Sequence, residues 1–270
     1  YPATSVTSKQ LLPVFDKPMI YYSLSTLMLA GIKDILLIST PHDIDNYKKL
    51  LSDGNKWGIS LDYAIQENPE GLAQALLIAE DYLDGNSSAL VLGDNIFYGS
   101  NFEQILNQAN NNKSGATIFA YRVENPSQFG VVDFDKNNNV LSITEKPELP
   151  KSNYAVTGLY FFDNSASDKA KKLKPSKRGE LEISELNNLY LNEKNLKVEI
   201  LGRGYAWLDT GTHADLLEAS HFISTLERRQ GFKICCPEEI AYRKNWISTN
   251  QLISLAEDIK NNNYGKYLLN

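Results

Sequence analysis

Apolar segments of two kinds alternate along the first half of this chain, and that alternation constrains the fold more than any other feature. Continuous apolar runs typical of buried parallel strands lie at Ile35 to Ser39 and Ala89 to Leu92. A segment with helical spacing follows each run, at Asp45 to Leu51 and at Phe102 to Asn110. Strands joined through helices in this way build a sheet with helices on both faces. We therefore predict an α/β fold with a doubly wound, mixed sheet.

The middle and the end of the chain follow different patterns. Three strand-like segments succeed one another at Val131 to Phe134, Val140 to Thr144 and Ala155 to Phe162, which predicts an antiparallel insertion. Beyond Gly231 the chain consists of short helical stretches. We expect a core over residues 1–230 and a helical C-terminal segment over 231–270 that contributes to an interface. Because the chain opens at Tyr1 in a loop, we also expect that an N-terminal strand and loop precede it.

The charge and cysteine content limit the class of partner and the compartment. The chain has 33 acidic and 27 basic residues, for a net charge of -6, which argues against a nucleic-acid or anionic-membrane partner. Its longest nearly apolar stretch, Met19 to Ile32, is shorter than the roughly 18 residues that a membrane span needs. The two cysteines are adjacent, at Cys235 and Cys236, so we expect a reducing, cytoplasmic setting rather than a disulfide scaffold. The partner is expected to be a small molecule.

Two aspartates stand where apolar strands end. Asp94 follows the run that begins at Ala89, and Asp209 follows Ala206 to Leu208. Because the carboxyl ends of strands line the ligand crevice of open α/β sheets, these two carboxylates could share a hard cation such as Mg²⁺. The alternative is that each one only caps a turn or the next helix.

Three cations are candidate phosphate ligands: Lys9, Lys146 and Arg178. A cation that faces a phosphate forms charge-assisted hydrogen bonds, and an arginine can use two donors at once. The alternative for each is a solvated charge at the end of a strand or helix.

The segment from Asn68 to Gln74 has the composition of a helix start. Asn68 would be the cap, Pro69 would lie in the first turn, and Gly71 would allow a close approach of the backbone. Amides at such a position suit a nucleotide, although a plain helix cap explains the pattern equally well. Gln66 carries one acceptor and two donors, so its amide could pair with the edge of thymine or uracil.

Other nucleotide motifs are missing from the sequence. Neither a Gly-x-Gly-x-x-Gly nor a Gly-x-x-x-x-Gly-Lys-Ser/Thr pattern occurs, which argues against dehydrogenases and P-loop proteins. Asp-x-Asp does occur, at Asp43 to Asp45 and Asp133 to Asp135, and would fit a metal-dependent glycosyltransferase. Asp43 is more simply explained as a helix cap.

Taken together, seven stretches closely resemble the glucose-1-phosphate thymidylyltransferases, a family of sugar nucleotidyltransferases with a Rossmann-like core. The resemblance runs nearly end to end. The stretches are Ser8–Pro13, Asp16–Tyr22, Leu92–Gly99, Ser152–Tyr160, Arg178–Glu182, Gly202–His213 and Tyr264–Leu269.

The resemblance implies a role for each candidate residue. It assigns the Mg²⁺ to Asp94 and Asp209 and the triphosphate to Lys9. It assigns the sugar phosphate to Lys146 and Arg178, so that these two and Lys9 form the catalytic set. The implied substrate-binding residues are Gln66 and Gly71 at the base, Gln10 at the nucleoside sugar, Gly130, Glu145 and Val156 at the hexose, Trp207 as a wall of the hexose pocket, and Asn95.

The implied reaction joins dTTP to glucose 1-phosphate, giving dTDP-glucose and pyrophosphate as the first step of dTDP-rhamnose synthesis. The resemblance also implies a homotetramer with a regulatory nucleotide-sugar site. Two departures stand out: the family's glycine-rich loop with Gly-Thr-Arg would precede Tyr1, and Phe129 stands where relatives commonly have tyrosine. The open alternatives are a metal-dependent glycosyltransferase and a non-catalytic nucleotide-sugar-binding protein on the same scaffold.

Overall fold

Two compact units share the chain, and each is assembled from segments that are far apart in the sequence. In this computed structural model, which describes residues 2–137 and 139–270, unit 1 comprises Tyr1–Tyr63, Leu92–Glu103 and Ala206–Asn270. Unit 2 comprises Ala64–Val91 and Gln104–Tyr205. Tyr1, where the expectation of a preceding segment falls, lies outside the described residues. The predicted division at residue 230 stays a prediction.

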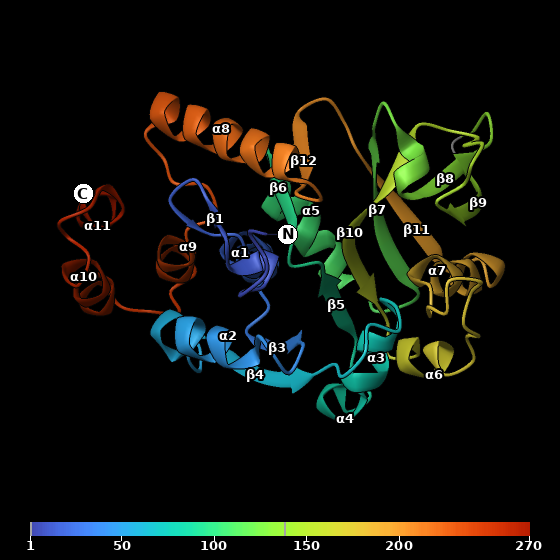
Figure 1. The fold of residues 1–270 in the computed structure, drawn as a ribbon, viewed down its shortest axis with the longest axis horizontal. Coiled ribbons are helices and arrows are strands. Elements are labelled where there is room, and N and C mark those ends of the chain that lie inside the picture. The colour runs from blue at the N-terminus through green and yellow to red at the C-terminus, as the bar shows by residue number, and fades with distance from the viewer. Residues whose placement is uncertain (1, 138) are drawn as a thin grey trace. The chain divides into compact units, whose positions relative to one another are not determined.

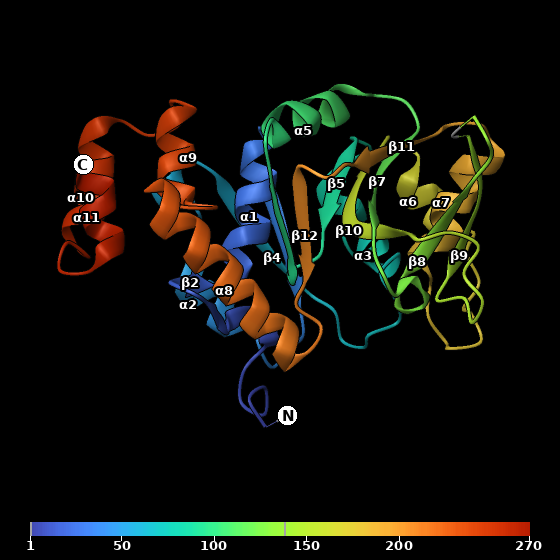
Figure 2. The ribbon, with the colours of Figure 1, turned by 90° about the horizontal axis from the view of Figure 1, so that it is seen from above.

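Unit 1 places helices around short strand pairs (Figures 1 and 2). The paired strands are β1 with β2, β3 with β4, and β6 with β12. The strands are β1 (Pro13–Val14), β2 (Lys17–Pro18), β3 (Asp34–Ser39), β4 (Ser60–Ile65), β6 (Asn95–Gly99) and β12 (Tyr205–Asp209). The helices are η1 (Lys9–Leu11), α1 (Ile20–Leu29), α2 (Ile44–Leu51), η2 (Asn55–Trp57), α8 (His213–Gln230), α9 (Pro237–Arg243), α10 (Thr249–Glu257) and α11 (Asn263–Leu269). Strands β4 and β12 and helix α5 (Phe102–Asn111) each cross a unit boundary.

One apolar cluster holds β6 against α8 in unit 1. Ile96 of β6 is fully buried and packs with Ala219 and Ile223, which are four residues apart on α8 and so lie on one face of that helix. Figures 1 and 2 both show β6 and β12 side by side. This packing fixes the ends of the two strands, which carry the predicted aspartates.

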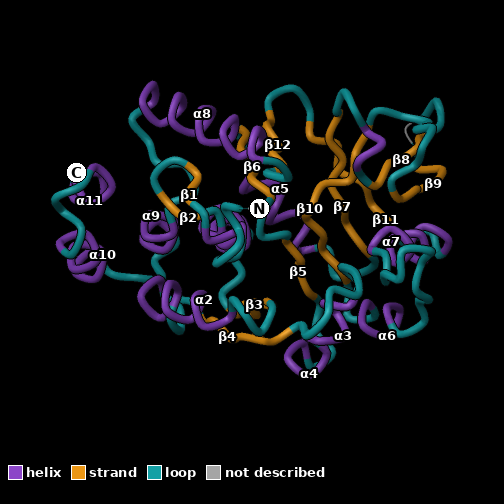
Figure 3. Tube along the Cα trace, in the orientation of Figure 1, coloured by secondary structure: helices purple, strands orange, loops and turns teal. Residues whose placement is uncertain are grey.

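The helices predicted beyond Gly231 are present as α9, α10 and α11, and α10 and α11 lie side by side in the tube view of Figure 3. A buried carboxylate ties them to the rest of unit 1. Glu238 of α9 accepts hydrogen bonds from Trp57 Nε1 at 3.0 Å and from the Tyr264 hydroxyl at 2.6 Å. Within the described residues, no helix is both long and apolar enough to cross a bilayer.

Unit 2 is built on a six-stranded sheet. Its strands follow the order β11-β7-β10-β8-β9, and β5 pairs with β10 as well. Strand β10 is antiparallel to β5, β7 and β8, whereas β7 and β11 run parallel, from Leu196 opposite Ala116 onward. The elements are α3 (Gln74–Ile78), α4 (Glu80–Leu83), β5 (Ser88–Val91), β7 (Ala116–Arg122), η3 (Pro126–Gln128), β8 (Gly130–Phe134), β9 (Val140–Glu145), β10 (Tyr154–Phe162), α6 (Ala166–Ala170), α7 (Ile183–Asn192) and β11 (Leu196–Leu201).

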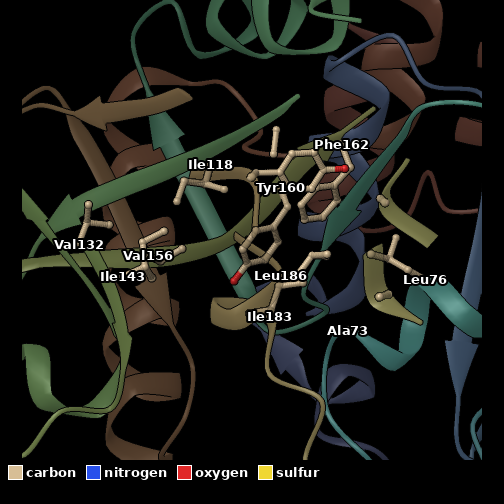
Figure 4. Packing of buried hydrophobic residues seen from close by; sticks show 14 of the residues in the cluster. Ala73, Leu76, Ile118, Val132, Ile143, Val156, Tyr160, Phe162, Ile183 and Leu186 are labelled. Atoms are coloured by element: carbon tan, nitrogen blue, oxygen red, sulfur yellow. The ribbon is translucent and has the colours of Figure 1, made fainter. Parts of the chain in front are cut away.

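The core of unit 2 lies between this sheet and helices α3, α6 and α7 (Figure 4). Tyr160 and Phe162 alternate along β10 and therefore share one face of the sheet, where their rings stack at 5.9 Å. Ile183 and Leu186 of α7 contribute to the same cluster. Val156, a predicted hexose residue, extends this cluster toward the first residues of β10.

The predicted α/β fold class is confirmed, and the predicted start of one helix is wrong. Strands β8, β9 and β10 are antiparallel neighbours, as predicted, and β10 also pairs with β5 and β7 in the middle of the sheet. Helix α3 begins at Gln74 and not at Pro69, because backbone hydrogen bonds with Leu181 hold the preceding residues in an extended loop.

Candidate active site

The predicted metal ligands stand where strands β6 and β12 meet. Asp94 immediately precedes β6, and Asp209 is the last residue of β12. The residue after Asp209 is bonded to Asp94, because the Thr210 amide and hydroxyl both donate to the Asp94 carbonyl, at 3.3 and 2.9 Å. The structure therefore brings the two acidic strand ends together, as the sequence predicted.

A chain of directed hydrogen bonds orients the Asp94 carboxylate. Trp207 Nε1 can only donate, and it donates to Asn95 Oδ1 at 2.6 Å. The Asn95 amide must then turn its nitrogen to the other side, where it donates to Asp94 Oδ1 at 3.1 Å. On the remaining oxygen, Lys9 Nζ lies 2.5 Å from Asp94 Oδ2. Four predicted residues thus form one continuous network in unit 1.

Asn95 is 2% exposed, so its side chain serves this network. The contact of Asn95 with a substrate stays a prediction, and the structure gives the residue a second task that the sequence did not suggest. It links Trp207 to Asp94 across paired strands. The only sequence signal for this link is the position of Asn95 directly after the strand-end aspartate.

The donor set at these strand ends suits a hard divalent cation. Mg²⁺ is commonly held by one or two carboxylates together with substrate phosphates and waters. The Asp94 side chain is 22% exposed, and each oxygen of a carboxylate has more than one acceptor site, so its present hydrogen bonds leave room for a cation. Among the described residues there is no group of three or more metal-binding side chains, so substrate phosphates would have to complete the coordination.

The predicted hexose residues cluster in unit 2. Gly130 and Glu145 are opposite each other in the pairing of β8 with β9. A Cβ placed on Gly130 would lie 3.3 Å from Glu145 Oε2, 3.2 Å from Ser184 Oγ and 3.8 Å from Val156 Cβ. Gly130 therefore keeps a small space open among these three side chains. Ser184 was not predicted; its hydroxyl donates to Glu145 Oε2.

Arg178 is held in a fixed orientation near the same cluster. Its Nε and Nη2 donate to Glu182, at 3.1 and 2.8 Å, and its Nη2 also lies 3.8 Å from Glu145 Oε1. Burial raises the pKa of the Glu182 carboxyl, but hydrogen bonds from Arg178 and Ser176 together with the charge of Lys146 outweigh burial and lower the pKa overall. Glu182, which holds the Arg178 guanidinium in place, could not be predicted from the sequence.

Lys146 occupies an unusual backbone position beside Glu145. Its φ of 39° lies in the left-handed region, which is uncommon for residues other than glycine. The Lys146 amide donates to the Phe129 carbonyl at 3.0 Å, which holds this conformation. Such strained positions are often found where a side chain must be aimed at a ligand.

The predicted base-reading residues lie in the loop before α3. Gln66 Nε2 donates to Gln74 Oε1 at 2.5 Å, which turns the Gln66 carbonyl oxygen away from Gln74. Gly71 has a φ of 105° and lies against the backbone of Leu181, where a Cβ would come within 2.4 Å of the Leu181 oxygen. The predicted close approach at Gly71 is therefore present, and its partner is another backbone segment of unit 2.

Gly71→Ala should lower the free energy of unfolding by about 3 kcal/mol or more, since a side chain there is both strained and in collision. Gly85 is the matched control, because it too has a positive φ, of 70°, but nothing lies within 4 Å of a Cβ at that position. Gly85→Ala should cost only about 1 kcal/mol. Urea unfolding of both variants measures the difference; equal losses would contradict the role of the Leu181 contact.

One aspartate of each Asp-x-Asp pattern makes structural hydrogen bonds. Asp43 is the N-cap residue of α2, as predicted, but its carboxylate accepts from the Ser8 amide at 2.8 Å and makes no helix-capping bond. Asp135 accepts from the amides of Asn137 and Asn139 in a tight turn. Hydrogen bonds from Asn139 are the largest cause of the lowered pKa of Asp135.

Comparison with known proteins shows which class this fold and site belong to. Residues 1–225 match the family model described as nucleotidyl transferase, and the chain belongs to that family.

The relatives at high identity are named glucose-1-phosphate thymidylyltransferase. One from Xanthomonas campestris pv. campestris is 57% identical over 99% of this chain and 91% of its own length. One from Neisseria meningitidis is 57% identical over 100% and 93%, and one from Mycobacterium tuberculosis is 54% identical over 100% and 93%. The predicted resemblance is confirmed.

Solved structures agree with this assignment. A Bacillus anthracis protein, titled as a glucose-1-phosphate thymidylyltransferase in complex with a sucrose, aligns with a TM-score of 0.76 and 38% identity, over 82% of this chain and 89% of that one. A UDP-glucose pyrophosphorylase complexed with UDP-glucose aligns with a TM-score of 0.68 and 22% identity, over 83% and 93%. The second likeness concerns the fold alone, and it supports the Rossmann-like nucleotidyltransferase core.

Proposed function

We propose that this chain transfers a thymidylyl group from dTTP to glucose 1-phosphate and so forms dTDP-glucose and pyrophosphate. Relatives named glucose-1-phosphate thymidylyltransferase share 54% to 57% identity with this chain over nearly its whole length. The observation that carries the proposal at the level of residues is the network of Trp207, Asn95, Asp94 and Lys9 at the meeting ends of β6 and β12.

The chemistry needs positioning more than it needs an enzyme nucleophile. A phosphate oxygen of glucose 1-phosphate attacks the α-phosphorus of dTTP in line, and pyrophosphate leaves from the opposite side. The second pKa of a sugar phosphate is about 6, so the attacking phosphate is mostly dianionic at neutral pH and a general base adds little. The remaining barrier comes from bringing two anions together.

Asp94 and Asp209 are the residues that would hold Mg²⁺ with the dTTP phosphates. When bound, the ion neutralises charge on the phosphates and on the departing pyrophosphate. Lys9, already paired with Asp94 at 2.5 Å, is placed to exchange that carboxylate for a phosphate oxygen. The Trp207–Asn95 link keeps the Asp94 carboxylate from rotating while Lys9 exchanges partners.

In unit 2, Glu145 is proposed to accept hexose hydroxyls, with Ser184 fixing one of its oxygens. Gly130 and Val156 would line the space for the sugar ring. The substrate contact of Trp207 stays a prediction. Arg178 and Lys146 would bind the phosphate of glucose 1-phosphate. Because Glu182 holds Arg178 through two nitrogens, the guanidinium loses little freedom when it binds a phosphate. Gln66, Gly71 and Gln10 are proposed at the base and the nucleoside sugar.

Several finer properties belong to the same proposal. We infer a cytoplasmic enzyme of dTDP-rhamnose synthesis that acts on small molecules and not on nucleic acids or membranes. We infer a homotetramer with a regulatory nucleotide-sugar site, to which the segment 231–270 contributes. Large apolar side chains are exposed there: Phe232 at 65%, Ile253 at 43% and Leu269 at 41%. Such side chains suit a buried interface between copies.

Pyrophosphate release by the intact protein tests the reaction. With glucose 1-phosphate and Mg²⁺, dTTP should give steady release of pyrophosphate. UTP should react more slowly but measurably, because the methyl group of thymine contributes only about 1 to 3 kcal/mol of discrimination between the two nucleotides. Leaving out the sugar phosphate or the metal should stop release. A metal-dependent glycosyltransferase would release no pyrophosphate, and a binding protein would release none with any substrate; either result would overturn the proposal.

A further inference from the structure

The predicted nucleoside contact, Gln10, is the last member of a hydrogen-bonded chain that begins on α2. The Tyr47 hydroxyl lies 2.8 Å from Ser8 Oγ, and Ser8 Oγ lies 2.5 Å from Gln10 Oε1. The Ser8 backbone is fixed as well, because its amide donates to Asp43 Oδ1 at 2.8 Å. These four residues all belong to unit 1.

The chemistry of the three side chains gives this chain a direction. The carbonyl oxygen of the Gln10 amide can only accept, so Ser8 must use its one hydroxyl hydrogen on it. At the other contact Ser8 can therefore only accept, and Tyr47 must donate. The pKa of Tyr47 is raised above its ordinary value, chiefly by burial, which keeps this phenol protonated as the donor. The result is that the Gln10 nitrogen points away from Ser8.

The stem of Gln10 is confined from the opposite side. A Cβ on Gly93 would come within 2.9 Å of Gln10 Cγ, so the Gln10 side chain packs directly over that glycine. Gly93 precedes Asp94, whose carboxylate holds Lys9, the neighbour of Gln10 in the chain. The hydrogen bond from Ser8 therefore fixes the orientation of the Gln10 amide, and packing over Gly93 fixes its position. The side chain lies beside the hydrogen-bonded network of Asp94 and Lys9.

We propose that Tyr47 and Ser8 are positioning residues that present the Gln10 amide nitrogen as a donor to an acceptor oxygen of the nucleotide. This inference rests on the proposed function, in which Gln10 contacts the nucleoside sugar. A contact of this kind is made equally in the ground state and the transition state, so losing it raises KM for the nucleotide and leaves kcat nearly unchanged.

Tyr47→Phe removes only the first hydroxyl of the chain. Ser8 is then free to rotate, and the Gln10 amide is no longer held in one orientation. KM for dTTP should rise about threefold to tenfold, the range expected for one neutral hydrogen bond, with kcat and KM for glucose 1-phosphate unchanged. Ser8→Ala should give the same pattern. Steady-state pyrophosphate release measures all three constants.

Tyr63→Phe is the matched control. The Tyr63 hydroxyl also serves α2, because it donates to the carbonyl of Ser52, the residue that caps the C-terminal end of that helix. It has no part in the chain to Gln10. If Tyr47 acted only by stabilising α2, Tyr63→Phe would change KM for dTTP in the same way; the inference expects no change.

A double variant decides whether Tyr47 acts through Gln10. In a Gln10→Ala background, Tyr47→Phe should have no further effect on KM for dTTP, because the group that it positions is gone. Independent, multiplying effects in the double variant would overturn the inference, as would a wild-type KM in Tyr47→Phe itself. These outcomes are distinct from failure of the proposed function, in which the wild-type protein would release no pyrophosphate from dTTP.

Discussion

Asp209→Asn should lower kcat at least about 100-fold, or about 3 kcal/mol in activation free energy, while the protein folds normally. Asparagine keeps the shape of the side chain at the end of β12 but replaces a charged ligand by a neutral one, which weakens the hold on a divalent cation. Thermal unfolding should be little changed, because asparagine keeps the size and polarity of the side chain and the Thr210 bonds to Asp94 remain.

Asp215→Asn provides the control for this variant. Asp215 is the next acidic residue along the chain, and its carboxylate accepts from the Thr212 amide in the capping box of α8. Its loss should cost about 1 kcal/mol of stability and leave kcat unchanged. Turnover at saturating substrates and increasing Mg²⁺ separates the two variants. Near-native kcat in Asp209→Asn would remove that residue from the site.

Arg178→Ala should lower kcat/KM for glucose 1-phosphate about 100-fold, the second large effect that we expect. The guanidinium is anchored by Glu182 and can offer donors in a planar arrangement to a phosphate. Arg178→Lys should restore little of the loss, because a single ammonium cannot bond Glu182 and a phosphate with the same geometry. Steady-state kinetics with varied glucose 1-phosphate measures both variants.

The same substitution should also destabilise the protein, for a reason unrelated to catalysis. Glu182 is 7% exposed, and without Arg178 its side-chain hydrogen bond from Ser176 is left to compensate a buried charge. We expect a loss of about 1 to 3 kcal/mol in the free energy of unfolding. Arg178→Ala combined with Glu182→Gln should recover most of that stability but none of the kcat/KM. Recovery of kcat/KM in the double variant would contradict a direct role for Arg178.

Most elements could be predicted from the sequence because their apolar patterns are local. Helix α2 and strands β3 and β5 lie within one residue of their predicted bounds. What could not be predicted is pairing between distant segments. Strand β6 is five residues long and pairs with β12 about a hundred positions later, so the local sequence gives no sign of it. The central place of β10 depends in the same way on β5 and β7.

The loop before α3 shows how tertiary contacts override local preference. Asn68 and Pro69 have the composition of a helix start, yet Leu181 donates to the Glu70 carbonyl and accepts from the Ala73 amide. Two backbone hydrogen bonds to a distant segment outweigh the few tenths of a kcal/mol that separate helix starts from turns. Only the requirement for glycine at 71 was visible in advance.

Some residues of the candidate site could be predicted from the sequence pattern, and others could not. The position of Asp94 and Asp209 at strand ends follows from the sequence pattern, whereas the hexose residues depended on the resemblance to a family. Residues that orient other residues were missed altogether. Glu182 behind Arg178 and Tyr47 behind Gln10 act through contacts that the sequence does not encode locally. Glu182 precedes helix α7 and Tyr47 lies on α2, and neither residue type has a local sequence pattern that marks such a role.

Binding of Mn²⁺ in the presence of dTTP, followed by electron paramagnetic resonance, tests the central claim most directly, because it reads the cation without turnover. The claim is that Asp94 and Asp209, at the joined ends of β6 and β12, hold a divalent ion with the nucleotide phosphates. Wild-type protein and Asp215→Asn should bind the Mn²⁺–dTTP pair equally, and Asp209→Asn should bind it at least tenfold more weakly, by about 1.4 kcal/mol or more. Unchanged binding in Asp209→Asn would contradict the account.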